Sequence, residues 1–208
     1  MATGILGTKV GMTQIFDDKG YAIPVTIIKA GPCMITQKKN VLRDGYDSIQ
    51  IGYLESKKKL NRPLMGHLKR TGAPSFRHLK EYRLGKASGL NYEEGQLISL
   101  DSFSVGQKVN VSGKTIGKGF TSTQKRHNFA IGPMTHGSKN HRQPGSIGAG
   151  TSPGRVIPGK RMAGHLGDSY RTIKHLEIVG IHVDKHLMLV KGAIPGKTGN
   201  LVSVSLSK

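Results

Sequence analysis

The residues best suited to chemistry are cations that recur through a glycine-rich stretch of the chain. Between Asp101 and Asp168 there is no acidic residue, so none of these cations has an acidic neighbour in the sequence. Lys and Arg neutralise phosphates, and glycine lets backbone N–H donors approach a phosphate closely. The pattern indicates binding to the backbone of a nucleic acid. The candidate residues are Lys114, Lys118, Lys125, Arg126, Lys139, Arg142, Arg155, Lys160 and Arg161.

Four histidines lie in the same stretch, at positions 127, 136, 141 and 165. Their spacings of nine, five and 24 residues match no standard zinc pattern, and no Cys accompanies them. Neutral imidazole can instead stack on a base or hydrogen-bond to a phosphate or a 2′-hydroxyl. We therefore expect His127, His136 and His141 to contact RNA, and we expect no metal.

Catalytic and nucleotide-binding motifs are incomplete. Residues 117–119 (Gly-Lys-Gly) and 148–150 (Gly-Ala-Gly) are fragments of nucleotide-binding loops but complete neither a Walker motif nor a dinucleotide fingerprint. Cys33 lies beside Pro32 without a nucleophile motif, and the cations above have no carboxylate partner for acid–base chemistry. The sequence predicts no catalytic residue, no cofactor and no small-molecule substrate. An RNA-modifying enzyme would need a cofactor pocket or a nucleophile that the sequence does not display.

Smaller basic clusters lie outside this stretch. Residues 37–40 (Gln-Lys-Lys-Asn) and 57–59 (Lys-Lys-Lys) lie on predicted loops, where they would be either RNA contacts or solvated surface. Lys69 and Arg70 precede a glycine turn and follow a predicted helix that also offers His67. We predict that Lys69 and Arg70 contact RNA.

The overall charge supports a polyanionic partner. The chain has 208 residues, with 32 Lys and Arg against 12 Asp and Glu, which gives a net charge of +20 and a pI of about 10.2. A compact body with this charge is stable when a nucleic acid or an anionic membrane neutralises it. The single cysteine excludes an internal disulfide and a Cys-ligated zinc site, and favours a reducing compartment. No signal peptide is recognisable, and no run approaches the roughly 18 apolar residues of a membrane span.

Half of the net charge lies in one segment. Residues 102–167 carry ten Lys and Arg and no acid, and residues 113–167 are rich in Gly, Pro and His. Such a segment cannot bury enough apolar surface to offset its ordering entropy, so we expect a partner to order it. A solvated linker is disfavoured because apolar residues such as Phe120, Ile131 and Ile157 alternate with the cations. A long amphipathic membrane helix is disfavoured by the Gly and Pro content.

The flanking sequence predicts a mainly-β fold. Short runs rich in Val, Ile and Thr are separated by turn residues, which is typical of a small antiparallel barrel with strands on both sides of the basic segment. We predict a globular barrel body from residues 1–112 and 168–208, with residues 113–167 as an insertion anchored at both ends. The predicted strands are residues 5–16, 22–29, 34–38, 48–53, 96–100, 108–112, 172–182, 187–191 and 201–206.

Proline and local spacing refine this prediction. Pro24 places its strand at an edge or a bulge, because proline donates no backbone hydrogen bond. Residues 63–68 and 75–84 are predicted as short helices, the second with Ser75 as its N-cap and Phe76, Leu79 and Leu84 as an apolar stripe. Residues 119–127 could form a further short helix, although Thr and Ser are poor helix formers.

The basic segment resembles the signature of the large-subunit ribosomal protein three family. The similarity begins with Gly117-Lys118-Gly119-Phe120 and continues through many motifs at fixed offsets, and the N-terminal residues 4–13 are similar to the bacterial and organellar branch. The resemblance extends over effectively the whole chain. The further matching motifs are residues 125–129, 132–133, 135–139, 141–142, 144–148, 153–156 and 159–164.

The resemblance implies a six-stranded barrel like that of translation-factor domains, with short helices and a long loop. It implies a structural, non-enzymatic role in the large ribosomal subunit, in which the loop enters the 23S-type ribosomal RNA toward the peptidyl transferase centre. It also implies a role in nucleating subunit assembly, and neighbouring ribosomal proteins that include numbers fourteen and nineteen. The chain length fits a ribosome of the bacterial cytoplasm or the plastid stroma. Some bacterial members carry a methylated glutamine where this chain has Ala149, so that modification is not expected.

Overall fold

The computed structural model describes residues 4–84 and 92–207, and the chain divides into two compact units. The first unit, which we call the body, comprises the residues up to 114 and those from 170 onward. The second unit, which we call the arm, is Thr115–Ser169. The predicted insertion, residues 113–167, differs from the arm by two residues at each end.

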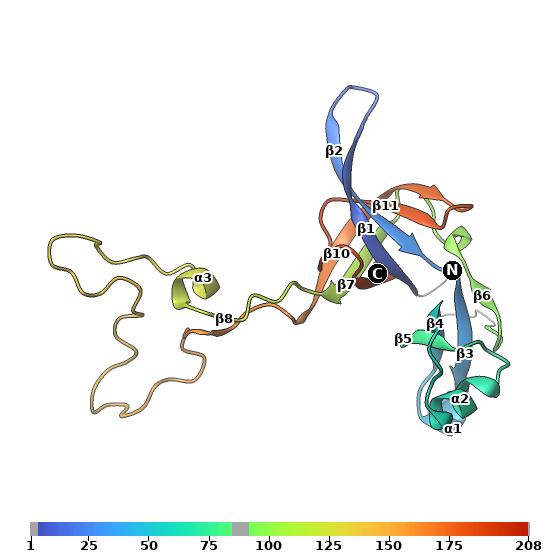
Figure 1. Ribbon diagram of the computed structural model, residues 1–208, viewed down its shortest axis with the longest axis horizontal. Coiled ribbons are helices and arrows are strands. Elements are labelled where there is room, and N and C mark those ends of the chain that lie inside the picture. Colours follow the sequence, from blue (N-terminus) through green and yellow to red (C-terminus); the bar gives the residue numbers. More distant parts are fainter. Residues whose placement is uncertain (1–3, 85–91, 208) are drawn as a thin grey trace. The chain divides into compact units, whose positions relative to one another are not determined.

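Six strands of the body form one antiparallel ring (Figure 1). The order around the ring is β1-β12-β7-β10-β11-β2, and β2 pairs with β1 to close it. Three of these strands precede the arm in the sequence and three follow it. The mainly-β class with short helices is confirmed. The strands are β1 (Gly4–Phe16), β2 (Ala22–Ala30), β7 (Lys108–Lys114), β10 (Tyr170–His182), β11 (Leu187–Lys191) and β12 (Leu201–Leu206).

The ring is filled by side chains that alternate inward along each strand. In β12, Val202 and Val204 are buried, and Val204 lies opposite Ile5 of β1 and Val111 of β7. This is the two-residue period of a strand with one face in the core. Burial of such aliphatic side chains contributes about 1.5–3 kcal/mol each, which is the main force that closes the ring.

A second antiparallel sheet of the body has the order β5-β4-β3-β6. Its strands are β3 (Cys33–Lys39), β4 (Ser48–Glu55), β5 (Phe76–Arg83) and β6 (Leu97–Ile98). The sheet shares one hydrophobic core with the ring, and Tyr82 joins them directly. The Tyr82 hydroxyl lies 3.2 Å from the Ile5 carbonyl oxygen and 2.6 Å from Ser203 Oγ. The sequence did not separate this sheet from the barrel.

The helices of the body are short. Residues 63–68 lie in a helix as predicted, within α2 (Arg62–Lys69). The others are α1 (Val41–Asp44) and the 3-10 helix η1 (Leu100–Ser102). The predicted strand over residues 96–100 is reduced to the two residues of β6, followed by η1.

The predicted helix over residues 75–84 is wrong, because this segment is strand β5. Phe76 and Tyr82 are both buried, and they are six residues apart, which places them on the same face of a strand. The pairing of β5 with β4 and the hydrogen bonds of Tyr82 outweigh the apolar spacing of Phe76 and Leu79, which also fits a helix.

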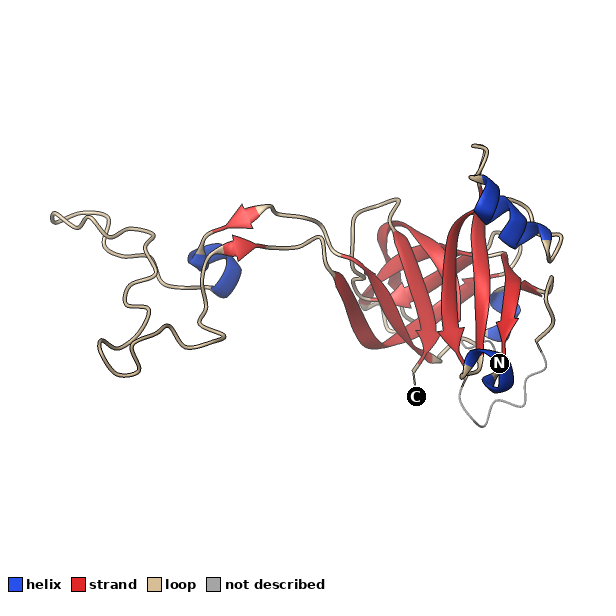
Figure 2. Cartoon of the chain, turned by 90° about the horizontal axis from the view of Figure 1, so that it is seen from below, coloured by secondary structure: helices blue, strands red, loops and turns tan. Residues whose placement is uncertain are grey.

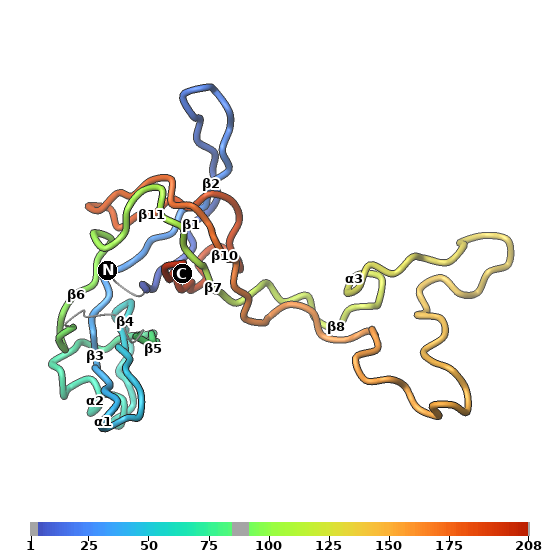
Figure 3. Tube along the Cα trace, turned by 180° about the vertical axis from the view of Figure 1, so that it is seen from behind, coloured from blue at the N-terminus to red at the C-terminus, as the bar shows by residue number. Residues whose placement is uncertain are grey.

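Pro24 lies at a local edge, as predicted. β11 pairs with β2 from Lys29 as far as Val25, so Pro24 is the first residue beyond this pairing. It lies opposite Gln14 of β1, and its carbonyl accepts the N–H of Gly192, just after β11, at 2.8 Å. Beyond this point β1 and β2 continue as a hairpin outside the ring (Figure 3). Within the described part of the chain, no helix has the length and apolar character needed to cross a membrane.

Candidate nucleic-acid interface

The arm consists of an outgoing and a returning stretch of chain, which we call its limbs. Backbone hydrogen bonds join the two limbs at their base. Its strands β8 (Phe120–Thr121) and β9 (Gly164–His165) pair with each other, and the rest is mostly loop (Figure 2). The N–H of Lys118 donates to the carbonyl oxygen of Leu166 at 2.8 Å, and the N–H of Leu166 donates to the carbonyl oxygen of Gly119 at 3.0 Å. The predicted helix over residues 119–127 is reduced to α3 (Thr123–His127), because β8 occupies its start.

Two predicted RNA contacts hold the limbs together. Arg126 Nη1 donates to the Met162 carbonyl at 2.8 Å, and His127 Nε2 donates to the same oxygen at 3.0 Å. Gly164 lies beside them, and a Cβ there would lie 2.5 Å from Arg126 Nη1, so any larger residue would displace the end of this side chain. The guanidinium has five N–H donors, so Arg126 retains donors for a phosphate while one serves this clasp.

A second contact between distant residues shapes the outer part of the arm. The N–H of Gly132 donates to the His141 carbonyl at 3.1 Å, and His141 Nδ1 donates to the Pro133 carbonyl at 3.0 Å. A Cβ at Gly132 would collide with the carbonyl oxygen of Asn140, so no other residue fits this approach. His141 therefore also has a structural role, with Nε2 left for another partner.

The arm has no hydrophobic core of its own. All its residues are described, and its only buried side chains are Thr121 and Thr123. Every residue from 142 to 163 is exposed, including Ile147 and Ile157. Local hydrogen bonds such as that from Ser146 Oγ to the Gly148 carbonyl, at 3.0 Å, define this part of the chain. Such a segment leaves its backbone, its apolar side chains and its cations open to a partner.

The arm is strongly positive. It contains eight Lys and Arg and one acidic residue, Asp168, and none of the eight cations is ion-paired with a described residue. The structure does not gather them into one pocket but spaces them along both limbs. This arrangement suits a polyanion that surrounds the arm. The cations are Lys118, Lys125, Arg126, Lys139, Arg142, Arg155, Lys160 and Arg161, and His136 is exposed among them.

The remaining predicted contacts, Lys69, Arg70 and Lys114, belong to the body. Lys114 is exposed at the end of β7 and lies opposite Tyr170 of β10, so the two ends of the arm leave from neighbouring strands. Its carbonyl accepts a hydrogen bond from Asn200 Nδ2 at 2.8 Å.

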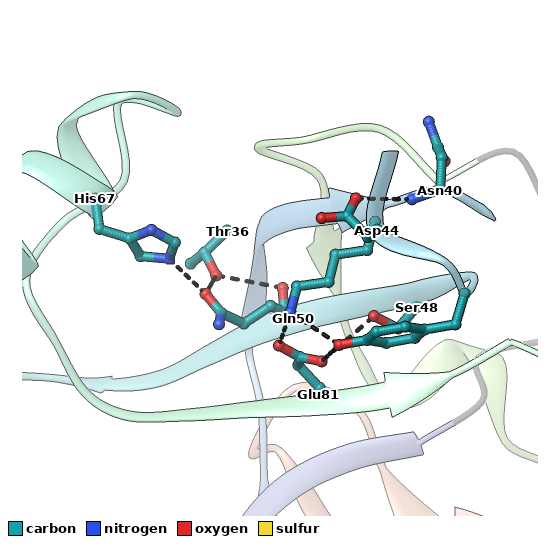
Figure 4. A network of polar contacts seen from close by, with 9 residues as sticks. Thr36, Asn40, Asp44, Ser48, Gln50, His67 and Glu81 are labelled. Atoms are coloured by element: carbon teal, nitrogen blue, oxygen red, sulfur yellow. Dashed lines mark hydrogen bonds and ion pairs between the residues drawn. The ribbon is translucent and has the colours of Figure 1, made fainter. Parts of the chain in front are cut away.

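Lys69 lines a surface groove of about 500 Å³ beside α2. Arg62 lines the same groove, and the sequence reasoning missed it. A spacing of seven residues places Arg62 and Lys69 on one face of the helix, and this was the signal that could have found it. Arg70 is exposed directly after the helix. His67, by contrast, points inward, and its Nε2 lies 2.8 Å from Gln50 Oε1, which attaches α2 to β4 (Figure 4).

The described residues offer little for covalent chemistry. Residues 4–84 and 92–207 contain no group of three or more His, Cys, Asp or Glu side chains placed to hold a metal ion. Cys33 is buried with Sγ 3.6 Å from the Leu6 carbonyl oxygen. Burial raises the pKa of its thiol to about 12, so the reactive thiolate is absent at neutral pH.

Comparison with known proteins gives one consistent result. The family model described as "Ribosomal protein L3" matches residues 89–185. The chain is 59% identical to large ribosomal subunit protein uL3 of Synechococcus elongatus over 206 residues, covering 99% of this chain and 96% of that protein. It is 58% identical to uL3c of Porphyra purpurea over 206 residues, covering 99% of this chain and all of that protein. It is 60% identical to uL3 of Nostoc punctiforme over 209 residues, covering 100% and 99% of the two chains.

Proposed function

The chain belongs to the ribosomal protein L3 family, and from this we propose that its arm, Thr115–Ser169, enters folded large-subunit ribosomal RNA and is ordered there. The protein is a structural constituent of the large ribosomal subunit and not an enzyme. Its place is the ribosome of the cytoplasm or of a plastid, since its relatives are bacterial and plastid proteins.

The observation that carries the proposal is an arm that is exposed, cationic and without a core. Eight unpaired cations distributed along two limbs can each neutralise a phosphate where RNA helices crowd together. RNA duplexes offer phosphates and 2′-hydroxyls in place of a readable major groove, so recognition is mainly by shape. Apolar side chains such as Ile131 and Ile157, which are exposed in the free chain, then pack against the RNA.

The finer assignments follow from the resemblance to the family. The RNA is of the 23S type, the arm points toward the peptidyl transferase centre, and binding nucleates subunit assembly. The neighbouring proteins include numbers fourteen and nineteen. On the body, Lys69, Arg70 and Lys114 bind RNA phosphates, and Arg62 joins them through the groove beside α2.

Removal of the arm tests the proposal. Lys114 and Tyr170 lie opposite each other, so an Asn-Gly turn can connect them in place of Thr115–Ser169. We expect this variant to keep the cooperative unfolding of the body and to lose most of its affinity for a 23S-type RNA transcript in filter binding. A folded armless variant that binds the transcript as tightly as the full chain would refute the proposal.

A further inference from the structure

The part of the β1–β2 hairpin outside the ring, residues 10–24, presents exposed apolar side chains beside a pair of acids, and we call it the ribbon. β12 pairs with β1 only over Gly4–Thr8, and β11 pairs with β2 only from Val25 onward. Backbone hydrogen bonds extend each contact by one residue, since the N–H of Lys9 donates to the Asn200 carbonyl and the Pro24 carbonyl accepts the N–H of Gly192. From Val10 and Ile23 outward the two strands pair only with each other, up to Phe16 and Ala22 (Figures 1 and 3). Among the described residues, no strand of either sheet continues alongside the ribbon.

One face of the ribbon is mainly apolar and is uncovered. Residues directly opposite in an antiparallel pair project to the same side, so Met12, Gln14 and Phe16 share a face with Pro24 and Ala22. Met12 is 51% exposed and Phe16 is 65% exposed, and at the turn Tyr21 is 69% exposed. A two-stranded hairpin is marginally stable alone, and exposed clusters of this kind mark interaction surfaces.

The charge of the ribbon opposes that of the rest of the protein. The ribbon contains Asp17, Asp18 and Lys19, so its net charge is −1 in a chain of +20. Asp17 Oδ1 accepts the N–H groups of Lys19 at 3.0 Å and Tyr21 at 2.8 Å, which fixes the turn and holds both acids at its tip. A phosphate backbone would meet two carboxylates and one cation here, which disfavours RNA.

We propose that the ribbon docks against a basic protein of the large subunit, which offers an apolar patch flanked by Lys or Arg. Met12 and Phe16 are the apolar anchors on this face, Tyr21 offers a further exposed aromatic ring at the turn, and Asp18 pairs with a cation at the rim. This inference rests on the proposed ribosomal role but not on RNA binding by the arm. The two inferences assign different partners to two surfaces of the protein: the arm binds RNA, and the ribbon binds a protein.

Photo-crosslinking in assembled subunits tests the proposal. p-Benzoylphenylalanine is introduced at position 16 of the full chain, the protein is expressed in bacterial cells, and purified large subunits are irradiated. We expect a crosslink to another protein, at a segment rich in Lys or Arg. A crosslink to RNA, a crosslink to a second copy of this chain, or the absence of any crosslink from position 16 would each overturn it.

A second crosslinking position distinguishes failure of the ribbon assignment from failure of the proposed RNA binding by the arm. The same group at position 157, an exposed apolar position of the arm, is expected to crosslink to RNA. If position 157 fails to reach RNA while position 16 reaches protein, the role of the arm is refuted and the ribbon assignment stands. The reverse result refutes the ribbon assignment alone.

A charge reversal at Asp18 tests whether the partner of the ribbon is basic. Asp18→Lys leaves the hydrogen bonds of Asp17 in place, so the turn is kept. We expect the protein crosslink from position 16 to fall several-fold, with Asp18→Asn giving a smaller loss. An unchanged yield in Asp18→Lys would overturn the assignment of a basic partner.

Discussion

The double replacement Arg142→Ala/Arg155→Ala is expected to weaken RNA binding and its dependence on salt without affecting the body. Both side chains are exposed and neither is ion-paired with a described residue. Their loss therefore removes no packing or hydrogen bond from the body, and we expect its free energy of unfolding to change by less than about 0.5 kcal/mol.

The magnitude follows from counterion release. Each neutralised phosphate contributes about 0.9 to the slope of log K against log salt for a duplex and about 0.7 for a single strand. Eight arm cations, each with one phosphate, give a slope of about −6 to −7, and removing two reduces it by about 1.4 to 1.8. At about 0.1 M monovalent salt this corresponds to binding roughly 25- to 60-fold weaker.

Filter binding to a 23S-type RNA transcript over a series of salt concentrations measures both quantities. Lys19→Ala/Lys197→Ala is the matched control, since it removes the same charge from exposed positions of the body. We expect the control to change the slope little. Equal losses in the two variants would mean that only the overall charge matters, and an unchanged slope in the arm variant would refute phosphate contacts by Arg142 and Arg155.

Three further predictions concern the body. The raised pKa of Cys33, about 12 as a result of burial, predicts slow reaction with a disulfide reagent at pH 8 in the folded chain and fast reaction in urea, so fast reaction when folded would contradict it. A hydrogen bond from Lys39, 2.5 Å from Glu81, and a second from Tyr46 lower the pKa of Glu81. Its contribution to stability is therefore present above its unfolded pKa of about 4.3 and is lost as the pH falls through the folded value. Glu81→Gln should therefore lower the urea midpoint more at pH 7 than at pH 3, and a loss that grows in acid would contradict this. Tyr82→Phe leaves Ser203 without its 2.6 Å partner and should cost about 1–3 kcal/mol in urea unfolding, whereas an unchanged midpoint would count against the buried bond.

Local patterns were sufficient for much of the fold. The run over residues 201–206, with Val202 and Val204, predicted β12, and the acid-free, glycine-rich composition predicted a segment without a core. Strand β5 was missed because Phe76 and Leu79 also fit a helical spacing, while the deciding contact is with Ser203, 121 residues from Tyr82. The second sheet was missed for the same reason, since strand partners depend on contacts distant in the sequence.

The candidate interface was predictable in residue type but not in detailed role. An acid-free run of Lys and Arg needs no tertiary information to indicate phosphate binding. The clasp formed by Arg126 and His127 does need it, because their acceptor is the carbonyl of Met162, 36 and 35 residues away. His67 lies in the helix before Lys69 and Arg70, and only the structure shows that its ring meets Gln50.

The continuous exposure of residues 142–163 also bears on the lifetime of the protein before it reaches its partner. Exposed loop backbone is the preferred substrate of proteases, so an unbound chain is cut first in this part of the arm. Such a cut would not release the pieces, because β7 on one side of it pairs with β10 and β12 on the other. Surplus copies would therefore survive as nicked but folded bodies without an intact arm, whereas the RNA that we propose to surround the arm would protect the chain from degradation.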